Sequence, residues 1–181
     1  MGRSVKIGIT GFPGAGKTKT LIQVIKMLEE DEFIVGGMIT ESIIEKGSRV
    51  GFYVKDWVSG EKAILAHKDF DSKITVGKYG VDLSALETVG VRAITTAVEQ
   101  CDIIVIDEVG KMEVESEKFI EAVSEAFQSD KPMILTLHKK SRNPLLQDIR
   151  RRDDVRILEV TAVNMDLLPY KIRSIMQGEI V

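Results

Sequence analysis

Eight residues near the start of the chain have the types and the spacing of a loop that binds phosphate. The stretch GFPGAGKT fits the pattern G-x-x-x-x-G-K-[ST] at every fixed position. Glycines let backbone N–H groups turn toward a ligand without a Cβ in the way. The Lys17 ammonium could bridge the terminal phosphates of a nucleotide, and the Thr18 hydroxyl could bind Mg²⁺. We therefore predict a nucleotide phosphate site made of Gly11, Phe12, Pro13, Gly14, Ala15, Gly16, Lys17 and Thr18.

Two carboxylates follow the most apolar stretch of the chain. Four consecutive β-branched residues, which are typical of a central strand covered on both faces, are Ile103, Ile104, Val105 and Ile106. Asp107 stands at the end of this strand, where an open parallel sheet has its ligand crevice, and could hold Mg²⁺ through the hydration shell of the ion. Glu108 could orient and deprotonate a water that attacks the γ-phosphorus in line.

Other candidates for the site are weaker. Lys111 could stabilise charge on the transferred group or simply be solvated, and Glu41 and Arg49 could face the site or have structural roles. The run RRRDD, Arg150–Asp154, resembles a lid that grips phosphate, although such a run is usually a solvated helix end. His67 and His138 are isolated in the sequence, and with one cysteine they make a structural zinc site improbable.

The elements that position these residues follow from hydrophobic periodicity. We predict strands within residues 5–10, 33–44, 103–106, 132–137 and 155–160, the second broken or bulged at Gly36–Gly37. Helices are expected at residues 18–29, from Asp82 or Ser84 to 99, and at 117–128, 145–151 and 168–176. Alternating faces and a Ser59–Gly60 turn predict an antiparallel meander inserted at about residues 38–66. The expected fold is α/β, a mostly parallel sheet with helices on both faces.

Composition narrows the class of protein. The 181 residues suit one domain, 1–181, and the 44% hydrophobic content is that of a globular protein. Lys plus Arg is 25, Asp plus Glu is 28, and the net charge of −3 gives no electrostatic footprint for nucleic acid. No apolar stretch approaches the roughly 20 residues that cross a bilayer. One cysteine, and a phosphate loop too close to Met1 for a signal peptide, lead us to expect a cytoplasmic protein.

The chain resembles the nucleoside-triphosphatases of the thermophile type, which include a mammalian cancer-related relative. The segment IDEVGKME resembles the D-E-[IV]-G-K-M-E segment of that family, RVGFYVKDWVSGE its R-x-G-F strand and turn, and VGKYGVDLSALE its V-G-x-Y-x-V-[DN] segment. The resemblance implies a three-layer P-loop fold and Mg²⁺-dependent hydrolysis of nucleoside triphosphates with broad base tolerance. It also implies a second part of the nucleotide site made of Ile103, Ile104, Val105, Ile106, Asp107, Glu108, Val109 and Gly110. The loop HKKSRNPLL, His138–Leu146, departs from the usual relatives.

Three classes of function remain open on this basis. A hydrolase needs only water as acceptor, which suits the Asp107–Glu108 pair. A nucleotide, nucleoside or polynucleotide kinase needs an acceptor pocket and a mobile lid, for which the sequence has no distinctive pattern. The segment DEVG matches the D-x-x-G signal of a regulatory GTPase. The N-K-x-D motif that reads guanine in such proteins is missing. The segment most similar to it, VNMD at Val163–Asp166, lacks the lysine.

Overall fold

The computed structural model describes residues 4–178, and its centre is a nine-stranded sheet. The strand order across the sheet is β5-β6-β4-β3-β2-β7-β8-β1-β9. The strands are β1 (Lys6–Gly11), β2 (Val35–Glu45), β3 (Ser48–Asp56), β4 (Lys62–His67), β5 (Thr75–Val76), β6 (Tyr79–Val81), β7 (Ile103–Val109), β8 (Met133–His138) and β9 (Val155–Glu159).

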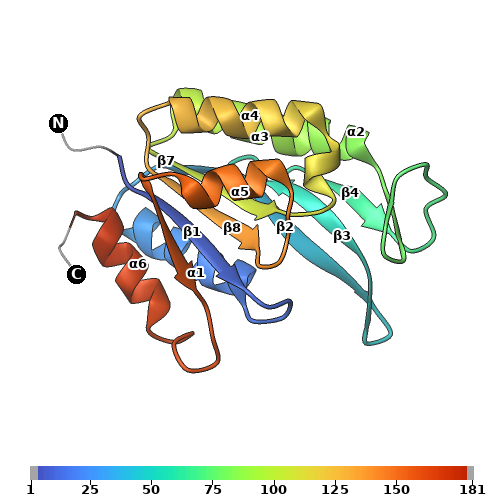
Figure 1. Cartoon of the computed structure of the whole chain (residues 1–181), viewed down its shortest axis with the longest axis horizontal. Helices are drawn as coiled ribbons and strands as arrows, with labels where there is room; N and C mark the ends of the chain where they lie inside the picture. Colours follow the sequence, from blue (N-terminus) through green and yellow to red (C-terminus); the bar gives the residue numbers. More distant parts are fainter. Residues whose placement is uncertain (1–3, 179–181) are drawn as a thin grey trace.

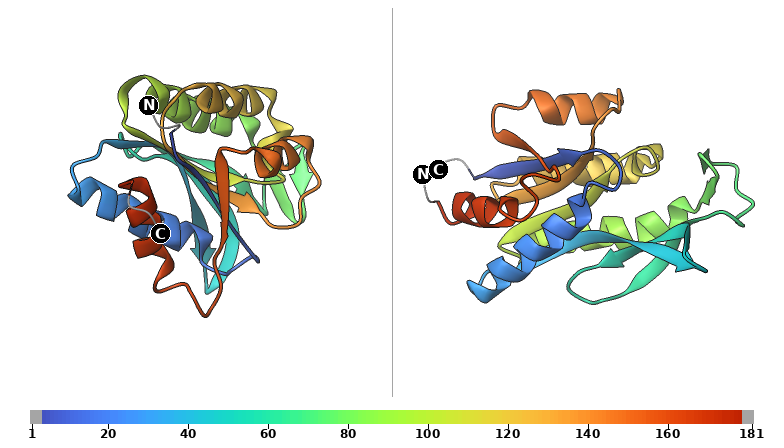
Figure 2. Two further views of the ribbon diagram at one scale, coloured as in Figure 1. Left: turned by 60° about the vertical axis from the view of Figure 1, so that its left-hand side comes forward. Right: turned by 90° about the horizontal axis from the view of Figure 1, so that it is seen from below.

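Helices cover both faces of the sheet, so the expected three-layer arrangement is confirmed (Figures 1 and 2). Helices α1 (Lys17–Glu30) and α6 (Leu168–Met176) lie on one face. The other face carries α2 (Leu83–Ala85), a π-helical turn (Leu86–Val91), α3 (Arg92–Gln100), a 3₁₀ turn (Glu113–Glu115), α4 (Glu117–Gln128) and α5 (Pro144–Arg151). No helix within residues 4–178 is both long enough and apolar enough to cross a membrane.

The parallel half of the sheet consists of β2, β7, β8, β1 and β9. Its strands alternate with helices along the chain, as the periodicity predicted. Strand β8 pairs with both β1 and β7 and therefore separates the strand before the phosphate loop from the strand that ends in the two carboxylates. The carboxyl ends of β1 and β7 nevertheless open on the same edge of the sheet.

The antiparallel half extends the same sheet and is longer than predicted. Strand β2 pairs with β7 in parallel from Val35 to Met38, and from Met38 onward it pairs with β3 in the opposite sense. Strand β4 follows, and the short hairpin of β5 and β6 continues the antiparallel order to Val81 rather than ending near residue 66. The meander is thus a lateral continuation of the sheet, and the sheet as a whole is mixed.

Two apolar cores lie on the two faces of the sheet. Leu21, Val24 and Ile25 of α1 pack with Ile172 of α6 on one face. On the other face, Phe119 and Val123 of α4 pack against β7 and β8, with Leu146 and Ile149 of α5. Such full burial contributes about 1.5–3 kcal/mol for each large aliphatic or aromatic side chain. The sheet is therefore held between helices on both sides, which fixes the strand ends where the site lies.

Side-chain caps and an ion pair help to secure the helices. Asp82 accepts hydrogen bonds from the backbone N–H groups of Ser84 and Ala85 at 3.0 and 3.3 Å, which confirms Asp82 as the predicted cap. Ser116 caps α4 through the N–H of Phe119 at 3.2 Å. The guanidinium of Arg173 donates two hydrogen bonds to the carboxylate of Asp31, at 2.8 and 2.5 Å, and joins α6 to the end of α1.

The glycine pair in β2 does not break the strand, contrary to the prediction. Strand β2 runs unbroken from Val35 to Glu45, and its irregularity lies between Ile43 and Ile44. Glycine is needed because the neighbouring chain approaches closely. A Cβ on Gly37, whose φ is +133°, would stand 2.0 Å from the carbonyl oxygen of Val105, and a Cβ on Gly36 would stand 2.5 Å from the Sγ of Cys101.

Replacing Gly37 with Ala is therefore expected to destabilise the fold strongly. The new Cβ would collide with backbone, and the φ region is almost exclusive to glycine. We expect the free energy of unfolding in urea to fall by about 3 kcal/mol or more. Gly60→Ala is the matched control, because Gly60 also has a positive φ of +76° but has no atom within 4 Å of its Cβ position. Equal losses in the two variants would contradict the close approach of β7.

Candidate active site

The phosphate loop links β1 to α1 and leaves the start of the helix free of side-chain caps. Gly14 and Gly16 have φ angles of +79° and +98°, which favour glycine. A Cβ at Gly14 would meet no atom within 4 Å, so this part of the loop faces open space. No side chain caps α1, and its first turn contains no acidic residue. The free N–H groups and the positive end of the helix dipole therefore favour an anion here.

The Lys17 side chain folds back over this loop. It is largely buried, and its ammonium donates a hydrogen bond to the carbonyl oxygen of Gly11 at 3.0 Å. The ammonium is thereby held at the mouth of the loop, where the predicted phosphates would lie. The loop between β8 and α5 lies beside it, because Lys139 and Lys140 place their ammonium groups 3.9 and 5.4 Å from the centre of the Phe12 ring.

The Asp107 carboxylate is fully buried and is held by three hydroxyl groups. Thr18 of α1 donates to its two oxygens at 3.1 and 3.0 Å. Thr40 of β2 donates from its hydroxyl at 3.0 Å and from its backbone N–H at 3.2 Å. Thr136 of β8 donates at 2.5 Å. Three elements thus converge on one carboxylate, and the predicted neighbourhood of Thr18 and Asp107 is present.

Burial and hydrogen bonding act on Asp107 in opposite directions. Burial raises the pKa of the Asp107 carboxyl, while the hydrogen bonds from Thr136, Thr40 and Thr18 lower it. The donors partly replace the water that a carboxylate loses inside a protein. The oxygens of Thr18 and Asp107 are hard ligands of the kind that Mg²⁺ takes from proteins alongside water and phosphate.

Glu108 points into a groove beside the loop, and another acid lies close to it. Burial raises the pKa of Glu108, and the negative charge of Asp107 adds to the rise, while the positive charges of Lys17 and Arg49 oppose it. Glu113, in the 3₁₀ turn, is only 4% exposed, and its pKa is raised well above the ordinary value by burial and by Glu108 and Asp107. Glu113 had not been recognised as a candidate from the sequence.

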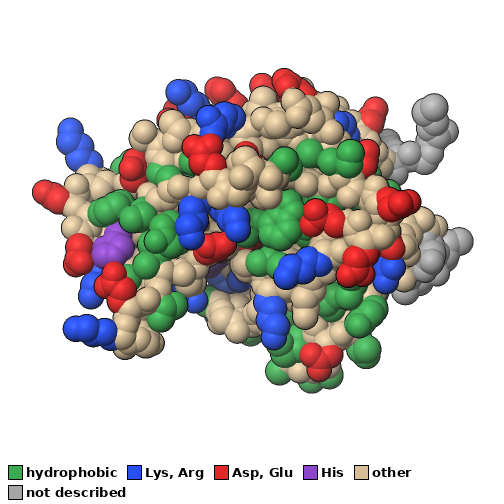
Figure 3. All heavy atoms as spheres, turned by 180° about the vertical axis from the view of Figure 1, so that it is seen from behind, with side chains coloured by type: hydrophobic (Ala, Val, Ile, Leu, Met, Phe, Trp, Pro, Cys, Tyr) green, Lys and Arg blue, Asp and Glu red, His purple; other side chains and the backbone are tan. Residues whose placement is uncertain are grey.

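The groove has a volume of about 760 Å³ and runs from the phosphate loop toward the hairpin of β2 and β3. Figure 3 views the molecule from behind relative to Figure 1. Charged side chains of both signs surround a hollow near the middle of that view. Arg49 and Glu41 both line the groove, and the Glu41 carboxylate is also paired with Lys55 at 3.3 Å and Lys62 at 3.6 Å. From the predicted site the groove is lined by Pro13, Gly14, Gly16, Lys17, Thr18 and Glu108.

A smaller cavity of about 150 Å³, here called the side pocket, adjoins the groove. It shares Glu108 and His138 with the groove, so His138 is not isolated in the fold. Burial lowers the pKa of His138, and the charges of Lys111, Lys17 and Arg150 lower it further, so the ring is neutral at neutral pH.

Lys111 lines the side pocket and is absent from the groove lining. The complete lining is Thr40, Phe52, Leu65, Val76, Glu108, Lys111, Met112, Glu113 and His138.

Several predicted site residues have supporting positions. The side chains of Ile103, Ile104, Val105, Ile106 and Val109 are at most 1% exposed, and neither they nor Gly110 lines the groove. They carry Asp107 and Glu108 to the strand end. Within the phosphate loop, Gly11, Phe12 and Ala15 likewise do not line the groove.

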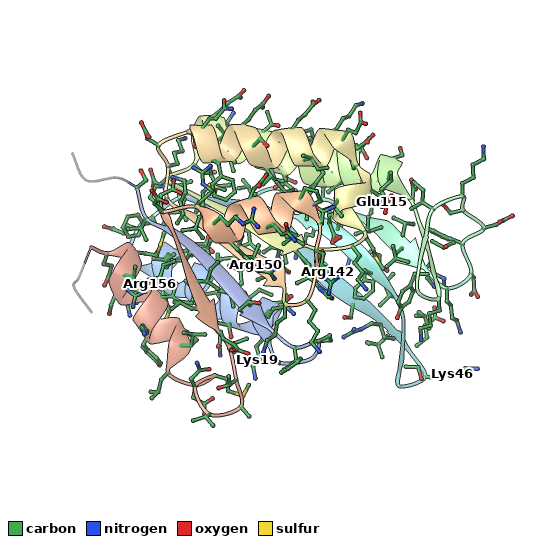
Figure 4. The ribbon with its side chains drawn as sticks, in the orientation of Figure 1. Lys19, Lys46, Glu115, Arg142, Arg150 and Arg156 are labelled. Atoms are coloured by element: carbon green, nitrogen blue, oxygen red, sulfur yellow. The ribbon has the colours of Figure 1, made fainter. Side chains whose placement is uncertain are left out.

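The basic run at the end of α5 is occupied by local contacts. Arg150 extends from α5 to the loop after β8 (Figure 4), where its guanidinium donates to the carbonyl oxygens of His138, Lys139 and Ser141. Arg152 donates two hydrogen bonds to the Asp154 carboxylate, at 2.8 and 2.9 Å. These contacts fix the His138–Leu146 loop. They give the run Arg150–Asp154 a structural role rather than the role of a lid.

Comparison with known proteins agrees with this arrangement. The sequence profile of a family described as NTPase matches residues 6–173. The chain belongs to this family. It is 37% identical to the nucleoside-triphosphatase THEP1 of Thermoplasma acidophilum over 97% of both chains. The crystal structure of THEP1 from Aquifex aeolicus superimposes with a TM-score of 0.85 at 32% identity, covering 96% of this chain and 99% of that one. The solution structure of a human cancer-related nucleoside triphosphatase has a TM-score of 0.81 at 31% identity, covering 99% of this chain and 100% of that one.

The resemblance noted in the sequence is thus confirmed, and so is the P-loop NTPase fold. The protein is a nucleoside-triphosphatase, a hydrolase whose substrates are nucleoside triphosphates. Among the described residues, no group of three or more His, Cys, Asp or Glu side chains could hold a metal ion by itself.

The buried hydroxyl of Thr136 gives a test of how Asp107 is held. Thr136→Val keeps the shape but removes one donor, and we expect the free energy of unfolding to fall by about 1–3 kcal/mol because a buried carboxylate loses a partner. Thr136→Ser keeps the hydroxyl and serves as the matched control, losing only a methyl group. Urea denaturation of both variants makes the comparison. A valine variant as stable as the serine variant would show that the hydroxyl does not support Asp107.

Proposed function

We propose that this nucleoside-triphosphatase releases the γ-phosphate of ATP, GTP, CTP and UTP with broad base tolerance and requires Mg²⁺. The observation that carries the proposal is the convergence at one groove. Lys17, Thr18 and Glu108 line it, and the Thr18 hydroxyl lies 3.0 Å from an oxygen of Asp107 behind them. The phosphate-binding lysine, the pair of Thr18 and Asp107 for the metal, and the base Glu108 therefore lie together where the γ-phosphate of a bound triphosphate would be.

The proposed Mg²⁺ site consists of Thr18 and Asp107, the latter acting through water. The donor set suits the ion, because Mg²⁺ is usually held by one or two protein oxygens together with waters and substrate phosphates. The carboxylate is already oriented by Thr40 and Thr136, which do not need to move. When bound, Mg²⁺ would neutralise charge on the phosphates and on the leaving diphosphate.

The residues of the chain divide the remaining work. Lys17 and the N–H groups at the start of α1 hold the phosphates in place and offset their charge. Glu108 orients a water for attack in line with the leaving oxygen and accepts its proton. Arg49 lines the same groove and is one of the positive charges that act on Glu108, so it is placed to stabilise negative charge near the γ-phosphate.

Broad base tolerance is supported by the loop between β9 and α6. This loop packs against the phosphate loop, since the Cε of Met165 lies 3.8 Å from a Cβ built on Gly16. The Asn164 amide is occupied within the loop: its oxygen accepts from the N–H of Thr161 at 2.8 Å, and its nitrogen donates to the carbonyl of Glu159 at 2.7 Å. It is therefore unable to read a guanine edge without giving up these bonds.

The outer surface of this loop exposes two large apolar side chains together with Asp166. Val163 is 93% exposed and Leu167 is 72% exposed. Apolar contact of this kind accepts any base, whereas strong selection needs buried polar groups that the wrong base leaves unpaired. These features also disfavour the guanine-selective switch that the VNMD segment had left open.

Replacing Glu108 with Gln should separate binding from chemistry. The amide keeps the shape but cannot accept a proton, so we expect near-normal affinity for the magnesium–triphosphate complex and a loss in kcat of about 100-fold or more. Lys17→Ala is the contrasting variant, since loss of the cation should weaken triphosphate binding as well as turnover. Titration calorimetry and phosphate release measure the two effects. Normal hydrolysis by Glu108→Gln would mean that another group positions the water.

Base choice is tested by steady-state phosphate release from the four triphosphates at saturating Mg²⁺. We expect kcat/KM values within about 30-fold of each other, equivalent to about 2 kcal/mol at the transition state. ADP should be a much poorer substrate, because both the leaving group and the bridge to the metal are altered. A preference for GTP above about a thousandfold would require a buried polar reader and would contradict the proposal.

A further inference from the structure

The side pocket is larger than hydrolysis requires. Its volume is about 150 Å³, whereas a water molecule takes up about 30 Å³ in the liquid. In another protein an apolar cavity of about this volume holds a benzene molecule. The pocket therefore has room for a ring-sized organic group beside Glu108, the group proposed to act as the base.

Apolar and polar side chains line the pocket together. Thr40, Phe52, Glu108 and His138 also line the groove. The residues that line the side pocket alone are apolar Leu65, Val76 and Met112 and charged Lys111 and Glu113. A molecule that fills this space could lay an apolar body against Leu65, Val76 and Met112 and present a polar group toward Glu108.

The apolar wall is firmly built from the antiparallel half of the sheet. Phe52 of β3 packs edge to face against Tyr79 of β6, with ring centres 5.3 Å apart. The guanidinium of Arg49 lies 5.2 Å from the centre of the same Phe52 ring. Leu65 comes from β4 and Val76 from β5. Phe52 supports Arg49, which the proposed phosphate site uses, but β4, β5 and β6 carry no residue of that site, so phosphate recognition alone does not account for Leu65 and Val76 in the wall.

Charge restricts what the pocket can hold. Glu108 and Glu113 both line it, and Lys111 is the one cationic side chain in its lining. An anionic group placed beside the Glu108 carboxylate in a partly desolvated space would be repelled. A nucleoside monophosphate is also too large for the volume. The lining thus favours a compact neutral molecule over a nucleotide.

We propose that the side pocket binds a neutral alcohol with a ring-sized apolar body, and that this alcohol accepts the γ-phosphoryl group in place of water. The idea rests on the proposed function, since it uses the same phosphate site and the same Glu108. The alcohol oxygen forms a bond to the γ-phosphorus, and the bond to the bridging oxygen breaks with its electron pair leaving on the diphosphate. The hydroxyl proton passes to Glu108. The products are a phosphate monoester and a nucleoside diphosphate.

Benzyl alcohol is a suitable probe, because it has one ring, one hydroxyl and no charge. The full chain is incubated with ATP and Mg²⁺, with and without the alcohol, and ADP and free phosphate are measured separately. We expect ADP to exceed free phosphate when the alcohol is present, with benzyl phosphate detected by phosphorus NMR as the difference. Glycerol, which lacks an apolar body, and UMP, which is anionic, should leave ADP and phosphate equal.

Filling the pocket supplies the matched variants. Val76→Phe adds bulk from β5 to the side pocket alone, so hydrolysis should stay within about twofold of wild type while ester formation falls about tenfold or more. Val58→Phe places the same ring on an exposed position of the β3–β4 turn, where Val58 is 61% exposed, and should change neither rate. Circular dichroism and thermal melting establish that both variants are folded.

The possible outcomes separate the two proposals. Equal amounts of ADP and phosphate with benzyl alcohol would overturn the acceptor proposal and leave hydrolysis intact. Absence of ADP under all conditions would overturn the proposed hydrolysis and the acceptor proposal with it. Ester formation that persists unchanged in folded Val76→Phe would show that the alcohol reacts outside the side pocket.

Discussion

The Asp107 carboxylate is wholly removed from solvent, and its stability there depends on donors supplied by the rest of the fold. Three hydroxyls reach it, from Thr18 on α1, Thr40 on β2 and Thr136 on β8. A buried carboxylate without such donors would cost several kcal/mol or give up its charge. The three elements must therefore be in their correct relative positions before the carboxylate is satisfied. The same contacts that complete the interior also set the distance between the phosphate loop and the acidic strand end.

The place of β8 explains how this distance arises. Because β8 lies between β1 and β7, the two strands that carry the site are two strand spacings apart, about 9–10 Å. Thr18 extends from the first turn of α1 to bridge the gap, and Thr136 supports the carboxylate from below. Strand β8 thus sets the spacing between the two strands and also supplies a donor to the carboxylate.

Local patterns in the sequence predicted most of the parallel half. The apolar run before Asp107, the stripe of α1 and the glycine loop depend on neighbouring residues, so periodicity and spacing were sufficient. Contacts between distant segments were not predictable in this way. Thr40 and Thr136 lie 67 and 29 positions from Asp107, and each looks like an ordinary strand threonine until the sheet is assembled. The only available signal was a polar residue inside an apolar strand, as at Thr136 in PMILTL.

The extent of the antiparallel half was underestimated from the sequence for a related reason. Strands β5 and β6 are two and three residues long, which is too short for any alternation to be visible. Gly36 and Gly37 suggested a break because their function, the close approach of Cys101 and Val105, is invisible without the neighbouring chain.

Strand β2 joins the two halves and gives each a separate role. Its first residues pair with β7 and hold the parallel order, whereas the residues from Met38 onward pair with β3 in the opposite direction. Thr40 lies just past this change and contacts Asp107 on one side while lining the side pocket on the other. The phosphate loop and Asp107 therefore belong to the parallel half, Arg49 is added to the groove from β3, and the space beside Glu108 is shaped by β3 to β6. The two halves also share one buried core, in which Val54 and Leu65 pack in the same cluster as Ile104 and Phe119, so the wall of the pocket and the strand that carries Asp107 rest on a common interior.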